Sequence, residues 1–166
     1  MNQLNWTQLI KIVSALPRGR RILFKNLIPI LPERMKTPWI ELHGFKMHLD
    51  LRQELDFDYA EGNYDKEEIE FLLQAYENDS WFLDIGANQG FYSLFYAKRI
   101  PQSRIVAFEP DPYNLRKLIE NVEENGFEQI VICPYAVSDS SEPKYLMINT
   151  GSNRAGSSFV VSQTRR

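Results

Sequence analysis

Short apolar segments alternate with segments of helical periodicity in the second half of this chain of 166 residues. Residues 81–85, 104–108 and 129–137 are expected to form strands, and residues 90–99 and 111–125 are expected to form the helices between them. Apolar strands that are separated by helices imply a parallel sheet with right-handed crossovers. The alternation therefore predicts an α/β fold built on three parallel strands.

Composition divides the chain into an N-terminal extension, residues 1–38, a middle segment, residues 39–80, and the alternating segment, residues 81–166. The first 32 residues carry five basic side chains and no acidic one. Apolar residues at helical spacing in this stretch predict a basic amphipathic helix that ends at Pro17. Two interpretations are open: the helix packs on the domain as a brace, or it makes a peripheral contact with an anionic membrane surface.

The middle segment is expected to hold a β-hairpin followed by a helix. Apolar and polar residues alternate on both sides of His43 and Gly44, where a turn is expected. A helix is expected to start at Asp65, a candidate N-cap, and to reach Tyr76, because its apolar residues fall on one face. The hairpin extends the chain before the main fold, and the helix is expected to pack on the sheet.

Charge and composition disfavour several classes of function. A formal net charge of −3 gives no general attraction to nucleic acid. The single cysteine, Cys133, stands in an apolar run and is expected to be a small core residue. His43 and His48 have no cysteine or carboxylate at ligand spacing, so no metal site is expected. No transmembrane segment or signal peptide is expected either, which predicts a cytoplasmic protein.

Residues 83–90, Leu-Asp-Ile-Gly-Ala-Asn-Gln-Gly, join the first expected strand to its helix. In an open α/β sheet, ligands bind beyond the carboxyl ends of the strands, and this turn lies at that edge. Gly86 and Gly90 lack a Cβ, so a ligand can approach the backbone closely. Glu109 ends the next strand, where its carboxylate can accept hydrogen bonds from both hydroxyls of a ribose. The turn and the acid together indicate a nucleoside site.

The polar residues of the turn favour a sulfonium cofactor over a dinucleotide. A pyrophosphate fingerprint requires three glycines, but Asn88 and Phe91 occupy the middle and last of these positions. S-adenosyl-L-methionine carries no phosphate, and Asp84 and Asn88 suit the ammonium end of its amino-acid tail. The sequence therefore favours S-adenosyl-L-methionine as the cofactor, and a nicotinamide-dependent oxidoreductase is the disfavoured alternative.

Three motifs resemble those of the FkbM family of methyltransferases: residues 83–93, Ala-Phe-Glu-Pro-Asp-Pro at 107–112, and Ala-Val-Ser-Asp at 136–139. The resemblance covers residues 59–159 and implies the first three strands of a Rossmann-like class I methyltransferase sheet. It implies a cofactor site formed by Asp84, Gly86, Ala87, Asn88, Gly90, Phe91, Ser93, Glu109, Pro110, Asp111 and Ala136. By this resemblance the turn frames the methionine part of the cofactor, and Glu109 holds the ribose. Pro110 and Asp111 border the adenine, and Ala136 closes the pocket.

The activity that the resemblance implies is O-methylation of a hydroxyl on a sugar, a polysaccharide or another small molecule. Relative to the family the chain is expected to be C-terminally truncated, without the strands that follow the segment resembling residues 144–159, so no catalytic residue is assigned. The far edge of the first strand and one face of the helices are then expected to be exposed unless a partner or a second copy covers them. Ser157, Ser158 and Arg154 either border an acceptor pocket or belong to a solvated loop. The alternative from a different class is a non-catalytic module that binds a nucleoside or a partner.

Several of these residues also have a structural interpretation. Glu109 can cap the helix that follows it, and Asp84 can cap the glycine-containing turn. Tyr92, Phe95 and Tyr96 recur at helical spacing and are expected in the core rather than in a pocket. The joint pattern of turn, acid and third motif carries the prediction of a cofactor site.

Overall fold

The computed structural model describes residues 26–62, 66–140, 144–152 and 157–160. The chain divides into two compact units, Met1–Asp65 and Lys66–Arg166. This boundary falls inside the middle segment that composition suggests, and it assigns the helix of that segment to the second unit. The basic amphipathic helix expected near the N-terminus lies outside the described residues.

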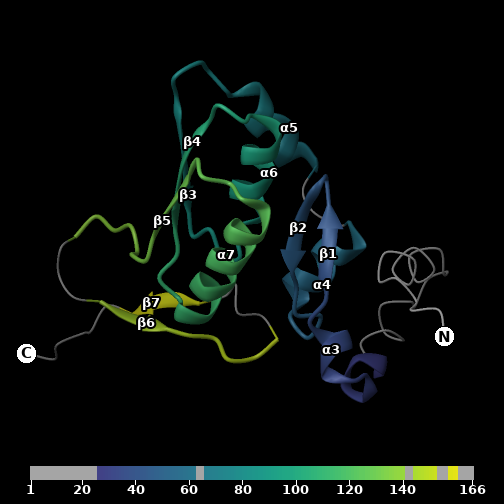
Figure 1. The fold of residues 1–166 in the computed structure, drawn as a ribbon. Coiled ribbons are helices and arrows are strands. Elements are labelled where there is room, and N and C mark those ends of the chain that lie inside the picture. The colour runs from purple at the N-terminus through teal and green to yellow at the C-terminus, as the bar shows by residue number, and fades with distance from the viewer. Residues whose placement is uncertain (1–25, 63–65, 141–143, 153–156, 161–166) are drawn as a thin grey trace, which may run out of the picture. The chain divides into compact units, whose positions relative to one another are not determined.

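The first unit contains the predicted β-hairpin (Figure 1). Its elements are η1 (Ile28–Ile30), α3 (Glu33–Lys36), β1 (Trp39–Leu42), β2 (Phe45–His48) and α4 (Glu54–Glu61). The antiparallel pair β1 and β2 closes through His43 and Gly44, whose φ angles of 50° and 83° suit a tight two-residue turn. Phe45 and Met47 of β2 are buried, and the residues that alternate with them are more exposed. Helix α4 was not predicted from the sequence.

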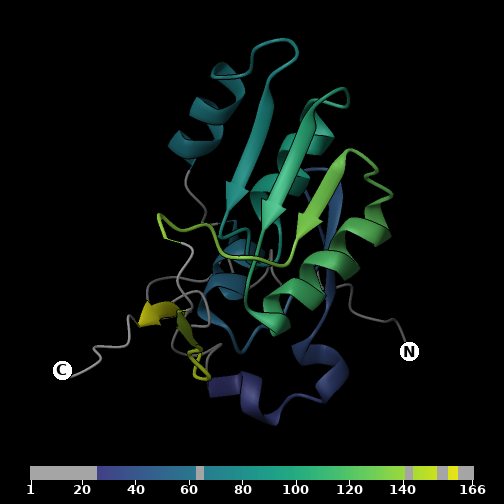
Figure 2. The same ribbon diagram turned by 90° about the vertical axis from the view of Figure 1, so that its left-hand side faces the viewer.

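The second unit carries a parallel three-stranded sheet of order β3-β4-β5. Its elements are α5 (Lys66–Gln74), β3 (Trp81–Ile85), α6 (Phe91–Arg99), β4 (Arg104–Phe108), α7 (Pro112–Asn125) and β5 (Ile130–Cys133). Figure 2 shows the three strands side by side, with α6 and α7 behind them. The predicted α/β fold with a parallel sheet and flanking helices is confirmed.

Local sequence signals explain where these elements begin and end. Helix α7 starts after Asp111, whose carboxylate accepts a hydrogen bond from the Tyr113 amide, and Pro112 occupies its first turn. Strand β5 was predicted to reach residue 137 but ends at Cys133, because Pro134 has no amide N–H to continue the ladder. Cys133 is therefore half-buried at a strand end rather than within the core.

One face of the sheet is buried and carries the core of the second unit. Ile105 and Ala107 of β4 are fully buried, as are Leu94 of α6 and Leu118 of α7. The predicted placement of aromatic residues in this core holds for Phe95 and Tyr96, which are only 2% and 4% exposed. Burial of these side chains supplies the main stabilising contribution to the unit.

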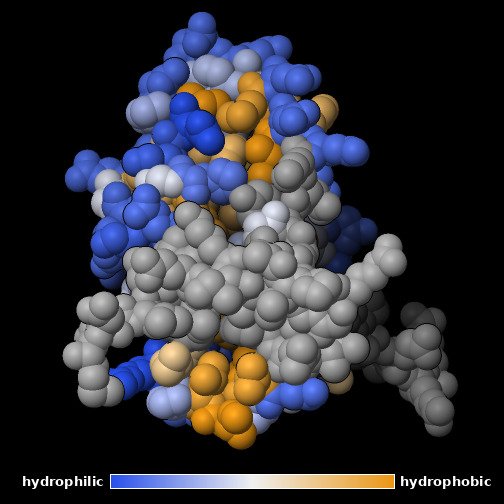
Figure 3. All heavy atoms as spheres, turned by 90° about the vertical axis from the view of Figure 1, so that its right-hand side faces the viewer, coloured by the Kyte–Doolittle hydropathy of each residue, from blue (hydrophilic) through white to orange (hydrophobic). Residues whose placement is uncertain are grey.

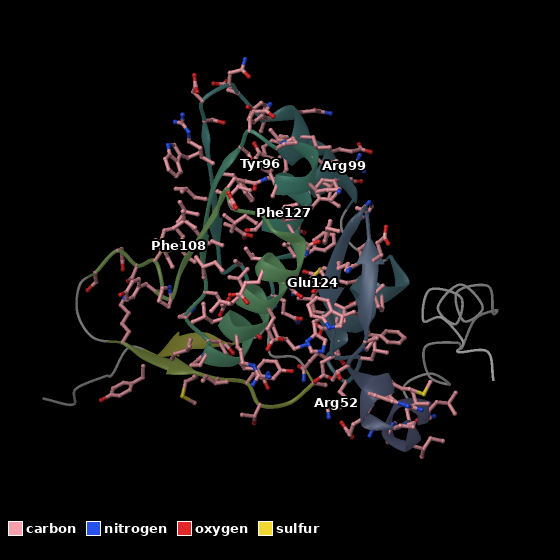
Figure 4. All side chains as sticks on the ribbon, in the orientation of Figure 1. Arg52, Tyr96, Arg99, Phe108, Glu124 and Phe127 are labelled. Atoms are coloured by element: carbon pink, nitrogen blue, oxygen red, sulfur yellow. The ribbon has the colours of Figure 1, made fainter. Side chains whose placement is uncertain are left out.

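The opposite face of the sheet is apolar and exposed. Trp81, Leu83 and Ile85 alternate along β3 and are 57%, 54% and 59% exposed, and Val131 of β5 is 52% exposed. Figure 4 labels Phe108 on this side of the sheet, away from α6 and α7. Within the described part of the second unit, this face is uncovered.

The C-terminal part of the described chain forms a separate hairpin. Strands β6 (Tyr145–Met147) and β7 (Ser158–Val160) pair antiparallel and do not join the parallel sheet. Ser158, for which a solvated loop was one of two interpretations, is the first residue of β7. Among the described residues, no helix combines the length and apolarity needed to cross a bilayer.

Candidate functional site

The turn between β3 and α6 lies at the carboxyl edge of the sheet and is tied to the end of β4. The backbone N–H groups of Gly86 and Ala87 both donate to the carbonyl oxygen of Phe108, each at 2.9 Å. The Gly90 amide donates to the carbonyl oxygen of Ala87 at 2.8 Å, which closes the turn before α6 begins. These bonds fix the backbone of the turn without using its side chains.

The two glycines of this turn have different surroundings. Gly90 has a φ of +90°, and a Cβ there would lie 2.5 Å from Cδ1 of Leu118, which is fully buried. Gly86 has a φ of +81°, but a Cβ there would meet no atom within 4 Å. Close packing against α7 therefore requires Gly90, whereas Gly86 borders open space at the sheet edge.

Asp84 is buried at the end of β3 and holds the first turn of α6. Its Oδ2 accepts hydrogen bonds from the Ser93 amide at 3.1 Å and from the Ser93 hydroxyl at 2.6 Å. Burial raises the pKa of Asp84, and the two hydrogen bonds from Ser93 oppose that rise. The structure thus gives Asp84 and Ser93 a helix-capping contact inside the protein.

Glu109 joins the glycine-containing turn to the start of α7. Its Oε2 accepts the Asn88 amide and its Oε1 accepts the Asp111 amide, both at 2.8 Å. The side chain is only 5% exposed, and burial raises its pKa while the two amide bonds lower it. The Asn114 side chain also donates a hydrogen bond to this carboxylate. Since each carboxylate oxygen has two lone pairs, one acceptor position remains for a ligand hydroxyl.

Asn88 presents an unused acceptor in the same turn. Its φ of 52° lies in the left-handed region, and its amide N–H is bound to Glu109. Its side-chain Oδ1 is buried, and no hydrogen-bond donor for it exists among the residues that the structure describes. Buried acceptors without a donor are uncommon in folded proteins, so this oxygen suits a donor that is supplied by a ligand.

The remaining predicted site residues lie before α7, after β5 and in the core of α6. Asp111 is buried as the N-cap of α7, and the hydroxyl of Ser157 lies 3.5 Å from its Oδ2. Pro110 is half-buried beside it, and Ala136 is half-buried in the irregular segment after β5. Phe91 is 1% exposed and stacks with a second aromatic ring of α6, so it is a core residue.

Ala87 and Asn121 show how the inner side of the turn is held. Ala87 is buried, and Asn121 of α7, also fully buried, donates its side-chain amide to the carbonyl oxygen of Gln89 at 2.9 Å. The sequence reasoning missed this contact. The sequence does contain a signal for this contact. Asn121 is a polar residue on the apolar face of α7, between Leu118 and Val122.

The described residues contain no group of three or more histidine, cysteine or acidic side chains placed to hold a metal ion. The two histidines belong to the hairpin of the first unit. His43 is exposed, and His48 stacks on Trp39 with ring centroids 4.9 Å apart. The chemistry available at the sheet edge is therefore that of carboxylates, amide groups and backbone.

Comparisons with known proteins connect the chain with a methyltransferase in sequence. Over 79 residues it is 30% identical to Methyltransferase 1 of Beauveria bassiana, a match that covers 41% of this chain and 32% of that protein. Over 44 residues it is 48% identical to the AMB antimetabolite synthetase AmbE of Pseudomonas aeruginosa, covering 26% of this chain and 2% of that protein. The chain thus matches 32% and 2% of the lengths of these curated relatives.

In structure, the chain is similar to Pyrococcus horikoshii TYW2, solved in complex with MeSAdo. The TM-score is 0.48 at 20% sequence identity, and the match covers 65% of this chain and 38% of that one. No family model matches the chain. The resemblance to the FkbM family therefore stays an interpretation of its motifs.

Proposed function

We propose that the β3–α6 turn and Glu109 bind S-adenosyl-L-methionine, and that the chain is part of a methyltransferase of the FkbM type. The main observation behind this proposal is the buried Oδ1 of Asn88, which lacks a hydrogen-bond donor among the described residues. Asn88 is two residues from Gly86, where a Cβ would meet no atom within 4 Å. The cofactor has hydrogen-bond donors of the required kind in its ammonium group and its ribose hydroxyls. The sequence match to a methyltransferase supports the same assignment.

The charge at the sheet edge favours a cationic cofactor over a pyrophosphate. Asp84, Glu109 and Asp111 place three carboxyl groups at or next to the ends of β3 and β4. A pyrophosphate beside them would be repelled, whereas a sulfonium and an ammonium would be attracted. S-adenosyl-L-methionine supplies a methyl group activated by its sulfonium, and the residues of the turn would bind and orient it for in-line displacement.

The acceptor in this proposal is a hydroxyl group of a sugar or polysaccharide. This part rests on the resemblance of the three motifs, and no residue is assigned as the base that removes the hydroxyl proton. We also propose a cytoplasmic location, in keeping with a chain that has one cysteine and so forms no internal disulfide. A partner or a second copy is proposed to cover the exposed face of the sheet.

Isothermal titration calorimetry of the full chain tests the cofactor. We expect S-adenosyl-L-methionine and S-adenosylhomocysteine to bind and NAD not to bind. Absence of binding by both sulfur compounds to the folded chain would overturn the proposal, and binding of NAD alone would replace it with a dinucleotide site.

Asn88→Gly tests the observation that carries the proposal. Glycine keeps the left-handed backbone and the amide bond to Glu109 and removes only the side-chain amide. We expect the affinity for S-adenosylhomocysteine to fall about tenfold, which corresponds to one lost hydrogen bond, while the stability of the chain stays unchanged. Glu109 is a poorer choice, because its loss also releases two backbone amides.

Asp79→Gly provides the matched control. Asp79 is another residue with a left-handed φ, 67°, but it precedes β3 and so lies at the opposite edge of the sheet. Its substitution is expected to leave the affinity for S-adenosylhomocysteine unchanged. Equal losses in the two variants would assign the effect to the backbone of either turn rather than to the Asn88 side chain.

A further inference from the structure

The β6–β7 hairpin is attached to the loops that follow β4 and β5. Before β6, Nζ of Lys144 donates hydrogen bonds to the Ser138 hydroxyl and, at 3.1 Å, to Oδ1 of Asp139. Before β7, the Ser157 hydroxyl donates to Oδ2 of Asp111 at 3.5 Å. Both loops leave the carboxyl ends of their strands, and Figure 2 shows the yellow hairpin below the arrowheads of the sheet. The hairpin therefore lies at the sheet edge that carries the proposed cofactor site.

Ser157 joins this hairpin to a fixed point of the fold. Its hydroxyl also accepts the Asn149 amide at 3.2 Å, so one side chain ties the segment after β6 to the segment before β7. Asp111 is only 1% exposed, and its Oδ1 accepts the Tyr113 amide at the start of α7. Because Asp111 is held by the helix that it caps, it can position the hairpin.

The hydrogen bonds continue from Asp111 to the β3–α6 turn. The Asp111 amide donates to Oε1 of Glu109, whose Oε2 accepts the Asn88 amide, both at 2.8 Å. Glu109 is 5% exposed, so water competes little for these bonds. A ligand that binds Glu109 and Asn88 would therefore stabilise the same residues that hold the hairpin.

We infer that the β6–β7 hairpin forms a wall of the cofactor site, and that Ser157 is a positioning residue that holds this wall through Asp111. The inference rests on the proposed function. In this arrangement Ser157 borders the site and does not belong to a solvated loop, in keeping with its half-buried side chain. Occupation of the cofactor site should then reduce local opening of the hairpin, because binding energy and hairpin order are coupled through shared hydrogen bonds.

Amide hydrogen exchange of the full chain, with and without saturating S-adenosylhomocysteine, tests the inference. In the wild type the ligand should slow exchange in the β3–α6 turn and also in residues 144–152. In Ser157→Ala the turn should stay protected, the protection of residues 144–152 should be lost, and the affinity should fall about three- to tenfold. Ser157→Thr keeps the hydroxyl and should restore both.

Lys144→Met provides a second variant. It removes the pair with Asp139, which is 95% exposed and therefore screened by water. We expect a smaller loss of protection than in Ser157→Ala. Circular dichroism should match the wild type in both variants.

Ser152→Ala is the matched control, because Ser152 is an exposed serine of the same hairpin. Ile30→Ser is a control in the first unit: Ile30 of η1 is 76% exposed, and Figure 3 shows apolar side chains at the bottom of the view, where Figure 1 places η1. Both variants should behave like the wild type. Protection of the turn without protection of residues 144–152, or unchanged protection in Ser157→Ala, overturns this inference alone. Absence of binding to the wild type overturns the cofactor proposal and this inference with it.

Discussion

The turn between β3 and α6 has a glycine at each end, and the two glycines have different surroundings. At the α6 end, Gly90 packs so closely on Leu118 that a Cβ would overlap its side chain. At the β3 end, Gly86 has the same left-handed backbone and no atom within 4 Å of a Cβ position. Backbone conformation favours glycine at both positions, but only Gly90 is also required by close packing within the protein.

This difference shows that a glycine motif does not by itself locate a ligand. We group Asp84, at the end of β3, and Ser93 of α6 with Gly90 as the packed end, because their hydrogen bonds are made within the protein. Asn88, midway between the two glycines, is grouped with Gly86 as the open end, because its side-chain oxygen lacks a donor among the described residues. We therefore expect substitutions at the packed end to change stability and substitutions at the open end to change affinity.

Gly90→Ala should have the largest effect. The strain of a left-handed alanine adds to overpacking against Leu118, so the free energy of unfolding should fall by roughly 2–5 kcal/mol. Chemical denaturation measures the loss. Gly126→Ala is the control, because its φ is +62° and its Cβ position is empty, so only the backbone term of about 1 kcal/mol is expected. Equal losses of unfolding free energy in the two variants would contradict a packing role for Gly90.

Ser93→Ala should have the next largest effect, on stability alone. The buried carboxylate of Asp84 loses the hydroxyl bond, which should lower the free energy of unfolding by about 1–3 kcal/mol. The affinity for S-adenosylhomocysteine, measured by calorimetry, should not change. Ser103→Ala is the matched control, since Ser103 is buried but its hydroxyl has no partner within the described ranges, so its removal should cost little. A weaker affinity in Ser93→Ala would show instead that Ser93 contributes to ligand binding.

Gly86→Ala should cost only about 1 kcal/mol of stability, because the new methyl group meets no protein atom. The same methyl group enters the space proposed for the cofactor, so the affinity for S-adenosylhomocysteine should fall at least about tenfold. Denaturation and calorimetry on one preparation separate the two effects. The comparison between the ends fails if affinity is retained or if stability falls as far as in Gly90→Ala.

The pH dependence of stability should show the smallest effect. Burial raises the pKa of Asp84 above its usual value of 3.8, so the neutral form favours the folded state. Its contribution is fully present below pH 3.8 and is lost as pH rises through the raised pKa of the folded state. Denaturation at several pH values should therefore show the wild type losing stability relative to Asp84→Asn as pH increases. Glu109 also has a raised pKa but is common to both proteins, and a difference that grows in the opposite direction would contradict the burial of Asp84.

Most of the parallel sheet was predictable, because its signals are local. Apolar runs gave the bounds of β3 and β4, and Asp111 followed by Pro112 marked the start of α7. Strand β5 ends early because Pro134 cannot continue the ladder, and the apolar residues on both sides of Pro134 conceal this end from a periodicity pattern. The strands of the β6–β7 hairpin have three residues each, too few for periodicity to distinguish them from a loop.

The candidate site was predictable in its residue types but not in its internal contacts. Sequence spacing placed Glu109 beside the turn, yet it did not indicate that both carboxylate oxygens hold backbone amides. The same holds for Asn121, which reaches the turn from α7. Such contacts depend on how strands and helices pack in three dimensions, and neither periodicity nor spacing along the chain encodes them.

The bond between Asn88 and Glu109 also constrains the order of events during folding. It joins positions 21 residues apart, and the bond from Asn121 to Gln89 joins positions 32 residues apart. Both loops must close before the turn is held, whereas α6 and α7 can begin to form from local contacts. Recovery of ligand binding after dilution from denaturant should consequently lag behind recovery of the helical signal, so binding competence would report the completed pairing of β3 with β4.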